Sequence, residues 1–251
     1  MTERGPIRGV PPRTGMETMS SAMLEIPQYY RWMMAQVEPY LGDTVLDVGT
    51  GPGTHLPSLS GRRVIAADLS EACLADVGRR FPWVETLPAD ASDPAIAERL
   101  AGRGIDTITC LNVLEHIPDD GRAIETFARI LRARRGRLVL VVPAHQALYG
   151  PMDRLADHLR RYSRDGLVRL VEARGFRPLF VRHFNVVGGL AWYLNAKLLP
   201  VRDLSAPAVN WQIRVFGRVI LPLARVGDTM LNRWLGLPFG QSLIVVATPR
   251  S

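Results

Sequence analysis

The fold prediction starts from one stretch of sequence, Val45-Leu46-Asp47-Val48-Gly49-Thr50-Gly51-Pro52-Gly53. A short apolar run ends here in three glycines at alternate positions, and a helix is expected to follow them. Glycine permits a tight turn and lets a ligand approach the backbone closely. The stretch therefore predicts a buried strand that leads into a ligand-binding loop.

Apolar and helical segments alternate along the chain on the C-terminal side of this stretch. Strands are expected at 44–48, 63–67, 83–87, 105–111, 138–142, 176–184 and 243–248. Alternating strands and helices predict a parallel sheet covered on both faces. The all-apolar strand at 138–142 agrees, because strands buried on both faces lose the in–out alternation. We predict an α/β, Rossmann-like doubly wound fold, in which ligands lie beyond the carboxyl ends of the strands.

The chain is predicted to form one domain, 16–251, preceded by a disordered tail at 1–15. A helix is expected at 18–40, bent near Pro27. The segment 185–239 has apolar helical spacing and interrupts the strand pattern. A helical insertion of this kind is a candidate lid over the substrate. Extra core packing is the alternative.

The composition describes a globular protein. Apolar residues make up 47% and charged residues 22% of the 251 residues, which excludes disorder over most of the chain. No apolar run reaches the roughly 18 residues of a membrane span, and no secretory leader is expected. The two cysteines show no disulfide or zinc spacing. These features predict a cytoplasmic protein.

The charge does not identify a partner. The formal net charge is +7, but Lys197 is the only lysine among 31 basic residues, which indicates a coding bias toward arginine. The sequence contains no dense basic tract with interleaved aromatics, so nucleic acid is disfavoured as a partner. The chain also lacks histidines and carboxylates at metal-ligand spacing, and no metal is predicted.

Three further motifs follow the next three predicted strands: Asp68 ends the second, Asp90-Ala91 follows the third, and Asn112-Val113-Leu114-Glu115-His116 follows the fourth. Together with Asp47 and the glycines, these motifs resemble those of class I S-adenosylmethionine-dependent methyltransferases in order and spacing. The resemblance implies an antiparallel last strand, S-adenosylmethionine as cofactor and S-adenosylhomocysteine as product. It implies that Asp68 binds the two ribose hydroxyls and that the residues after the third strand bind adenine. The implied cofactor residues are Asp47, Gly49, Thr50, Gly51, Gly53, Asp68, Leu69, Asp90, Ala91, Asn112 and Val113.

Two alternatives use the same loop. A dinucleotide fingerprint requires a third glycine where Thr54 stands, so an NAD-type or nucleotide-sugar oxidoreductase matches less well. A nucleic-acid methyltransferase acting on a base amino group would carry Asn/Asp-Pro-Pro-Tyr after the fourth strand. The chain has Asn112-Val113-Leu114-Glu115 there.

Further segments resemble a bacterial small-molecule methyltransferase subgroup that is often found beside or fused to glycosyltransferases. They include Tyr30-Arg31-Trp32, His158-Leu159-Arg160-Arg161-Tyr162 and Leu237-Pro238-Phe239-Gly240. Tyr30 is a candidate to cover the cationic sulfur through its aromatic face, with core packing as the alternative. The expected reaction is methyl transfer to oxygen, before nitrogen or carbon, in secondary, glycan or lipid metabolism.

Two histidines follow the fourth and fifth strands and should face the ligand crevice. His145 is the first candidate for a general base, and His116 is the second. The alternative for His116 is that it only positions the loop beneath the cofactor.

The acceptor is predicted to bind the loop that follows the fifth strand. The candidate substrate residues are Tyr149, His158, Arg160, Arg161, Tyr162 and Trp192. Paired arginines suit an anionic acceptor, and the tryptophans of the insertion suit a hydrophobic one. The alternative is a helix start in which the arginines pair with Asp153 and Asp157. Peripheral membrane contact is left open, as is the choice between a monomer and a homodimer.

Overall fold

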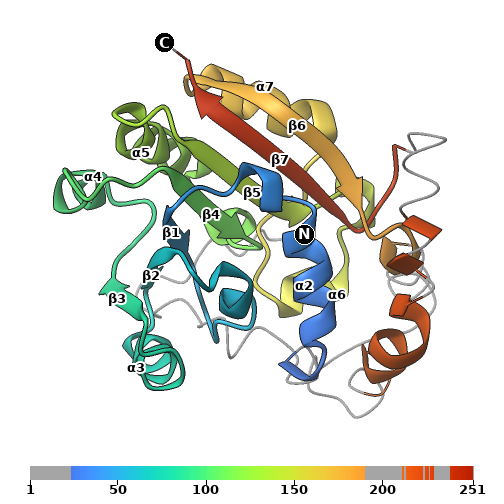
Figure 1. Cartoon of the computed structure of the whole chain (residues 1–251). Coiled ribbons are helices and arrows are strands. Elements are labelled where there is room, and N and C mark those ends of the chain that lie inside the picture. Colours follow the sequence, from blue (N-terminus) through green and yellow to red (C-terminus); the bar gives the residue numbers. More distant parts are fainter. Residues whose placement is uncertain are drawn as a thin grey trace.

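The structure is a computed structural model that describes residues 24–189, 211, 213–222, 224–225, 227–228 and 238–250. Seven strands form one sheet (Figure 1). They are β1 (Thr44–Val48), β2 (Arg63–Asp68), β3 (Val84–Pro88), β4 (Thr107–Leu111), β5 (Arg137–Pro143), β6 (Phe176–Phe184) and β7 (Ser242–Pro249).

The strand order is β3-β2-β1-β4-β5-β7-β6. Strands β3 to β5 pair in parallel, whereas β7 runs antiparallel to both of its neighbours. The predicted doubly wound, mainly parallel sheet with an antiparallel last strand is therefore confirmed. The order reverses between β1 and β4, and such a switch point opens a crevice at the carboxyl ends of these strands.

Helices cover both faces of the sheet. The α-helices are α2 (Pro27–Ala35), α3 (Glu71–Arg80), α4 (Ala95–Arg99), α5 (Asp120–Arg132), α6 (Pro151–Leu155) and α7 (Arg164–Ala173). Short 3₁₀ helices are η2 (Glu38–Tyr40), η3 (Leu56–Leu59), η4 (Leu114–His116) and η5 (Gln146–Leu148), and Phe216–Ile220 forms a π-helical turn. Asp119 and Ser163 cap α5 and α7 by accepting hydrogen bonds from backbone N–H groups.

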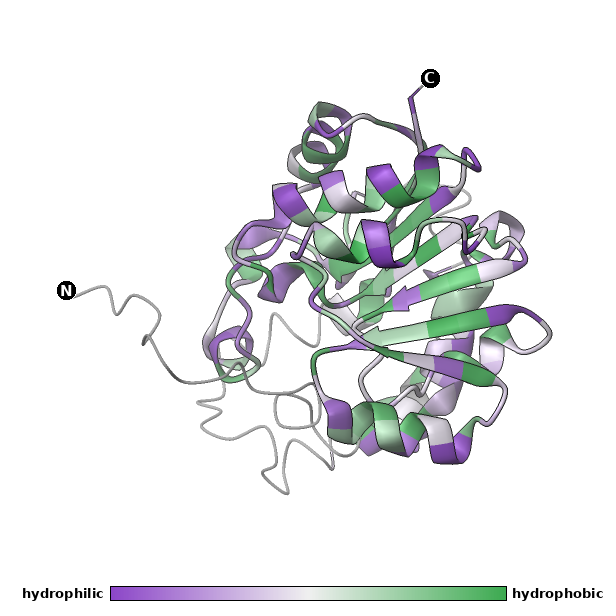
Figure 2. Ribbon diagram, turned by 90° about the vertical axis from the view of Figure 1, so that its left-hand side faces the viewer, coloured by the Kyte–Doolittle hydropathy of each residue, from purple (hydrophilic) through white to green (hydrophobic). Residues whose placement is uncertain are grey.

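Two hydrophobic cores lie on the two faces of the sheet. Helices α4, α5 and α7 pack on one face, with Phe127 at the centre of the core. Helix α2, η3 and α3 pack on the other face, where Trp32 contacts Phe184. Figure 2 shows that the strands are mostly hydrophobic and that the helices carry polar residues on their outer sides.

Two local elements differ from the sequence prediction. The first described α-helix begins at Pro27, and the tail at 1–15 lies outside the described residues, as does the start of the helix expected at 18–40. The glycine loop leads into the four-residue 3₁₀ helix η3 rather than a long α-helix. The backbone leaves the helical conformation at Ser60 and turns at Gly61, whose φ is +87°, so η3 ends at Leu59.

The predicted insertion at 185–239 is described only in part, and residues 190–210 lie outside the description. Within the described residues, no helix has the length and apolar character to cross a membrane.

Candidate active site

The glycine loop after β1 has the conformation that its sequence demands. Gly49, Gly51 and Gly53 all have positive φ, between +50° and +67°. A Cβ at Gly49 would lie 2.4 Å from Cγ2 of Val113, so the loop packs tightly against the residues after β4. A Cβ at Gly51 would meet nothing within 4 Å, which leaves open space above this peptide for a ligand. Thr50, between them, is buried.

Substitutions at these two glycines should separate folding from ligand binding. We expect Gly49→Ala to lower the free energy of unfolding by about 2–4 kcal/mol, because the methyl group collides with Val113 and φ is left-handed. Gly51→Ala should lower it by only about 1–2 kcal/mol. Its methyl group would instead obstruct the open space, and S-adenosylhomocysteine should bind at least tenfold more weakly. Urea unfolding and calorimetric titration measure the two effects, and equal stability losses would contradict the distinction.

Asp47 lies at the end of β1, beneath the loop, and is buried. One carboxylate oxygen accepts a hydrogen bond from Thr109 Oγ1 at 2.6 Å, and the other lies 2.8 Å from Nε2 of His55. Burial opposes ionisation, but the charge of His55 and these hydrogen bonds outweigh it, so the pKa of Asp47 lies below its usual value. Both oxygens are thus occupied within the protein, and a direct cofactor contact by Asp47 stays a prediction.

Asp68 ends β2 and connects directly to the glycine loop. Its carboxylate accepts hydrogen bonds from the N–H groups of Gly51 at 2.7 Å and Ser70 at 2.8 Å. An ionised carboxylate has about four acceptor positions, so capacity remains for a ligand. The predicted ribose contact therefore starts from an Asp68 that is already oriented beside the loop.

The other predicted cofactor residues lie at the ends of neighbouring strands. Leu69 is 60% exposed, and Ala91 follows the exposed Asp90 in a turn closed by Ser92. Asn112 follows β4 with a φ of +54°, which asparagine tolerates, and its N–H bonds to Val141. The structure thus brings the four motifs to one edge of the sheet, while their contacts with the cofactor stay predictions.

Tyr30 lies on α2 within the second core. Its ring is buried and meets Tyr29 edge to face, with ring centroids 5.6 Å apart. This packing supports the alternative held for this residue, a core aromatic, more than a cover over the cofactor.

His145 follows β5 in a strained conformation, with φ +63°. Its ring stacks on His183 at 4.9 Å and on Phe239 at 5.1 Å, which come from β6 and from the segment before β7. Burial and the charge of Arg161 lower the pKa of His145, so its ring is neutral near pH 7. Nε2 is buried and has no hydrogen-bond partner among the described residues. A neutral ring of this kind can accept a proton.

His116 and Glu115 lie together in η4, after β4. Burial, together with the charge of His158, lowers the pKa of His116 to about 4. Glu115 is fully buried, and burial raises its pKa to about 7 against the opposing charge of His158. The His116 ring meets the His158 ring edge to face at 4.9 Å.

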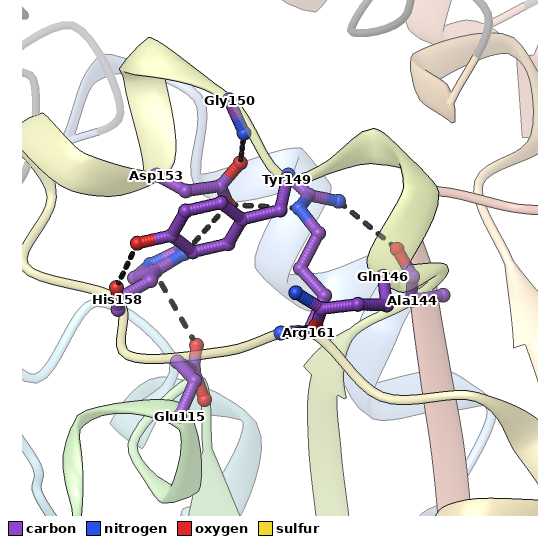
Figure 3. Close-up of polar contacts among 8 residues, drawn as sticks. All are labelled: Glu115, Ala144, Gln146, Tyr149, Gly150, Asp153, His158 and Arg161. Atoms are coloured by element: carbon purple, nitrogen blue, oxygen red, sulfur yellow. Dashed lines mark hydrogen bonds and ion pairs between the residues drawn. The ribbon is translucent and has the colours of Figure 1, made fainter. Parts of the chain in front are cut away.

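The loop after β5 is organised by one buried carboxylate, Asp153 (Figure 3). It accepts hydrogen bonds from the N–H of Gly150 at 2.9 Å and from Nε of Arg161 at 2.8 Å, and it lies 2.9 Å from Nδ1 of His158. Arg161 is itself buried and also donates to the backbone carbonyl of Ala144. This arrangement favours an ion-paired loop over an arginine pair free to bind an anion.

The neighbouring side chains of the loop are also engaged within the protein. Arg160 pairs with Asp120 at 2.7 Å, and the Tyr162 hydroxyl donates to the same carboxylate at 2.8 Å. The Tyr149 hydroxyl donates to the backbone carbonyl of His158 at 2.8 Å. Substrate contacts by these residues stay predictions, and Trp192 lies outside the described residues.

Sequence reasoning missed the part played by Glu115 and Asp120, and it named Asp153 only as a possible partner of the arginines. Each lies in a loop or at a helix start, where an acidic residue normally faces solvent. Glu115 was noted only as a letter within the motif after the fourth strand. The pattern of apolar and polar residues does not predict that a carboxylate will be buried, because the residues that pair with it come from distant segments.

The comparisons with known proteins identify the family of the chain. Residues 28–180 match the family model described as a methyltransferase domain. The chain therefore belongs to this family, and the prediction of a class I S-adenosylmethionine-dependent methyltransferase is confirmed. The association with glycosyltransferases stays a prediction.

Two relatives and one solved structure illustrate the similarity. A probable S-adenosylmethionine-dependent methyltransferase of Mycobacterium tuberculosis is 29% identical over 130 residues, which cover 51% of this chain and 46% of the relative. A ubiquinone biosynthesis O-methyltransferase of Azotobacter vinelandii is 36% identical over 103 residues, or 39% and 43% of the two chains. The chain thus spans about half the length of the curated relatives it matches. An S-adenosylmethionine-dependent methyltransferase from Archaeoglobus fulgidus shares the fold, with a TM-score of 0.56, 18% identity and coverage of 88% and 94%.

Proposed function

We propose that the protein transfers the methyl group of S-adenosylmethionine to a hydroxyl oxygen of a small, largely apolar acceptor. The observation that carries the proposal is the pairing of the open glycine loop with Asp68, through the hydrogen bond from Gly51. A cofactor in contact with this loop would lie at the switch point between β1 and β4, where ligands of doubly wound folds bind.

The residues of the chain align the acceptor with the methyl group. When the acceptor atom is a hydroxyl oxygen, they also remove its proton. The cofactor, when bound, supplies the electrophilic methyl group. Alignment of the acceptor is the larger contribution, worth roughly 7–11 kcal/mol in favourable cases, and a general base adds about 10²–10⁴-fold in rate. His145 is our candidate base because its neutral ring has a buried nitrogen without a partner among the described residues. His116 is the second candidate.

The proposed class of acceptor is supported by the charges of the loop after β5. Arg160 and Arg161 are paired with Asp120 and Asp153, so the structure lends little support to an anionic acceptor. The rings of His145, His183 and Phe239 form an aromatic stack beside the end of β5. An aromatic acceptor such as a phenol suits this stack, because aromatic rings pack favourably on one another.

Binding and transfer can be measured separately. Calorimetric titration should show micromolar binding of S-adenosylmethionine and S-adenosylhomocysteine and no binding of NAD. Radiolabelled methyl transfer is then assayed with 3,4-dihydroxybenzoate and a prenylated derivative as acceptor probes. His145→Gln should lower kcat by about 100-fold with unchanged cofactor affinity. Binding of NAD alone would contradict the proposal, and an unchanged kcat in His145→Gln would remove this histidine as the base.

Cytoplasmic location and a monomer or homodimer stay predictions for this protein. A nucleic-acid acceptor gains no support from the described residues, because the arginines beside the site are paired with carboxylates of the chain.

A further inference from the structure

Three potential metal ligands come together at the carboxyl edge of the sheet, from two separate segments. Glu115 and His116 lie in η4 after β4, and His158 lies between α6 and α7. Each residue offers one ligand atom, and the three atoms lie within 4.8 Å of one another. Sequence spacing could not reveal this group because His158 joins the other two only in the fold.

The Glu115 carboxylate lacks the partners that a buried charge requires. Its side chain is fully buried, and neither oxygen accepts a hydrogen bond from another residue in the part of the chain that the structure describes. The nearest cationic candidate is Nε2 of His158, 3.9 Å from Oε1, which is beyond hydrogen-bond distance. A buried carboxylate without donors is costly, and a cation bound at this position would remove the cost.

His158 is oriented as metal-binding histidines usually are. Asp153 lies 2.9 Å from Nδ1 of His158, and the carboxylate is fixed in turn by Arg161 and Gly150. Figure 3 shows the His158 ring directed toward Glu115, with Nε2 3.9 Å from Oε1. A proton on Nδ1 leaves the lone pair on Nε2, the nitrogen nearer Glu115. In metal sites, the nitrogen of a histidine that does not bind the metal commonly donates a hydrogen bond to a carboxylate or a backbone carbonyl.

We propose that Glu115, His116 and His158 bind a divalent transition-metal ion of the zinc type. Two imidazoles and one carboxylate suit Zn²⁺, Co²⁺ or Fe²⁺, whereas Mg²⁺ and Ca²⁺ prefer oxygen ligands only. The ion would neutralise the buried carboxylate and join the loop after β4 to the segment before α7. This inference does not depend on methyl transfer.

The test uses the full chain, stripped with a chelator and dialysed. Titration with Co²⁺ should give one equivalent of bound metal with a visible ligand-field absorption band, and Zn²⁺ should displace it. Zn²⁺ should also raise the Tm, because it binds only the folded chain. Glu115→Gln and His158→Gln should each weaken binding at least 100-fold, while His183→Gln, a histidine outside the group, should bind as the wild type does.

Three outcomes would overturn the inference. These are no binding by the wild type, equal binding by the wild type and both ligand variants, and tighter binding of Mg²⁺ than of Zn²⁺. Circular dichroism verifies that each variant is folded. If one of them does not fold, His116→Gln provides the same comparison at the third ligand.

Discussion

Asp153→Ala is expected to lower the free energy of unfolding by about 3–5 kcal/mol, because it leaves the buried guanidinium of Arg161 without its counter-ion. Asp153 is fully buried and accepts hydrogen bonds from Gly150 and Arg161, with His158 as a further partner. The variant would lose all three contacts at once. Urea unfolding followed by circular dichroism measures the change.

A matched control is Arg160→Ala, which breaks the partly exposed ion pair with Asp120. Exposed and partly exposed pairs contribute about 1 kcal/mol or less, so this variant should remain close to the wild type. Similar losses in the two variants would show that the Asp153 contacts do not organise the loop. A loss below about 1 kcal/mol in Asp153→Ala would show the same.

Asp68→Ala is expected to weaken the binding of S-adenosylhomocysteine by about 100-fold with a smaller effect on folding. The reason lies in the proposed ribose contact. Each hydrogen bond to a charged group contributes about 1.5–3 kcal/mol, and 1.4 kcal/mol corresponds to a tenfold change in affinity. The substitution also removes the acceptor of the hydrogen bond that the Gly51 N–H donates to Asp68. Calorimetric titration of both proteins gives the ratio of Kd values.

Asp93→Ala serves as the comparison for Asp68, because Asp93 is not among the predicted cofactor residues and its exposed carboxylate accepts a hydrogen bond from the N–H of Ala95 at the start of α4. We expect a change in affinity below tenfold for this variant. Asp68→Asn keeps one oxygen and should fall between the wild type and Asp68→Ala. Unchanged affinity in Asp68→Ala would show that the ribose lies elsewhere and would remove the main support for the proposed cofactor position.

The sheet and the glycine loop could be predicted because their causes are local. The strand at 138–142 contains only Leu and Val, and β5 runs from Arg137 to Pro143. The three glycines predicted a tight loop, and all three have the left-handed φ that favours glycine. The helix after this loop was predicted less well, because apolar spacing does not distinguish a four-residue 3₁₀ helix from a longer α-helix.

The acceptor side could not be predicted to the same extent. The sequence of the pair Arg160 and Arg161 does not distinguish arginines that bind an anion from arginines that pair with carboxylates of the chain. The structure places Asp120 and Asp153 against these side chains, and Asp120 lies in a different element of the chain. The local sequence therefore left two alternatives open, and the tertiary contacts favour one of them.

The sequence by itself determined the α/β class, the seven strands and the loop beside Asp68, because apolar periodicity and glycine act on the backbone over a few residues. Only the tertiary structure decided which charged groups are buried together. It joined Glu115 and His116 to His158, and Arg161 to Asp153. Burial of a charge depends on the partners that folding brings from distant segments, and those partners decide whether the group binds a ligand or stabilises a loop.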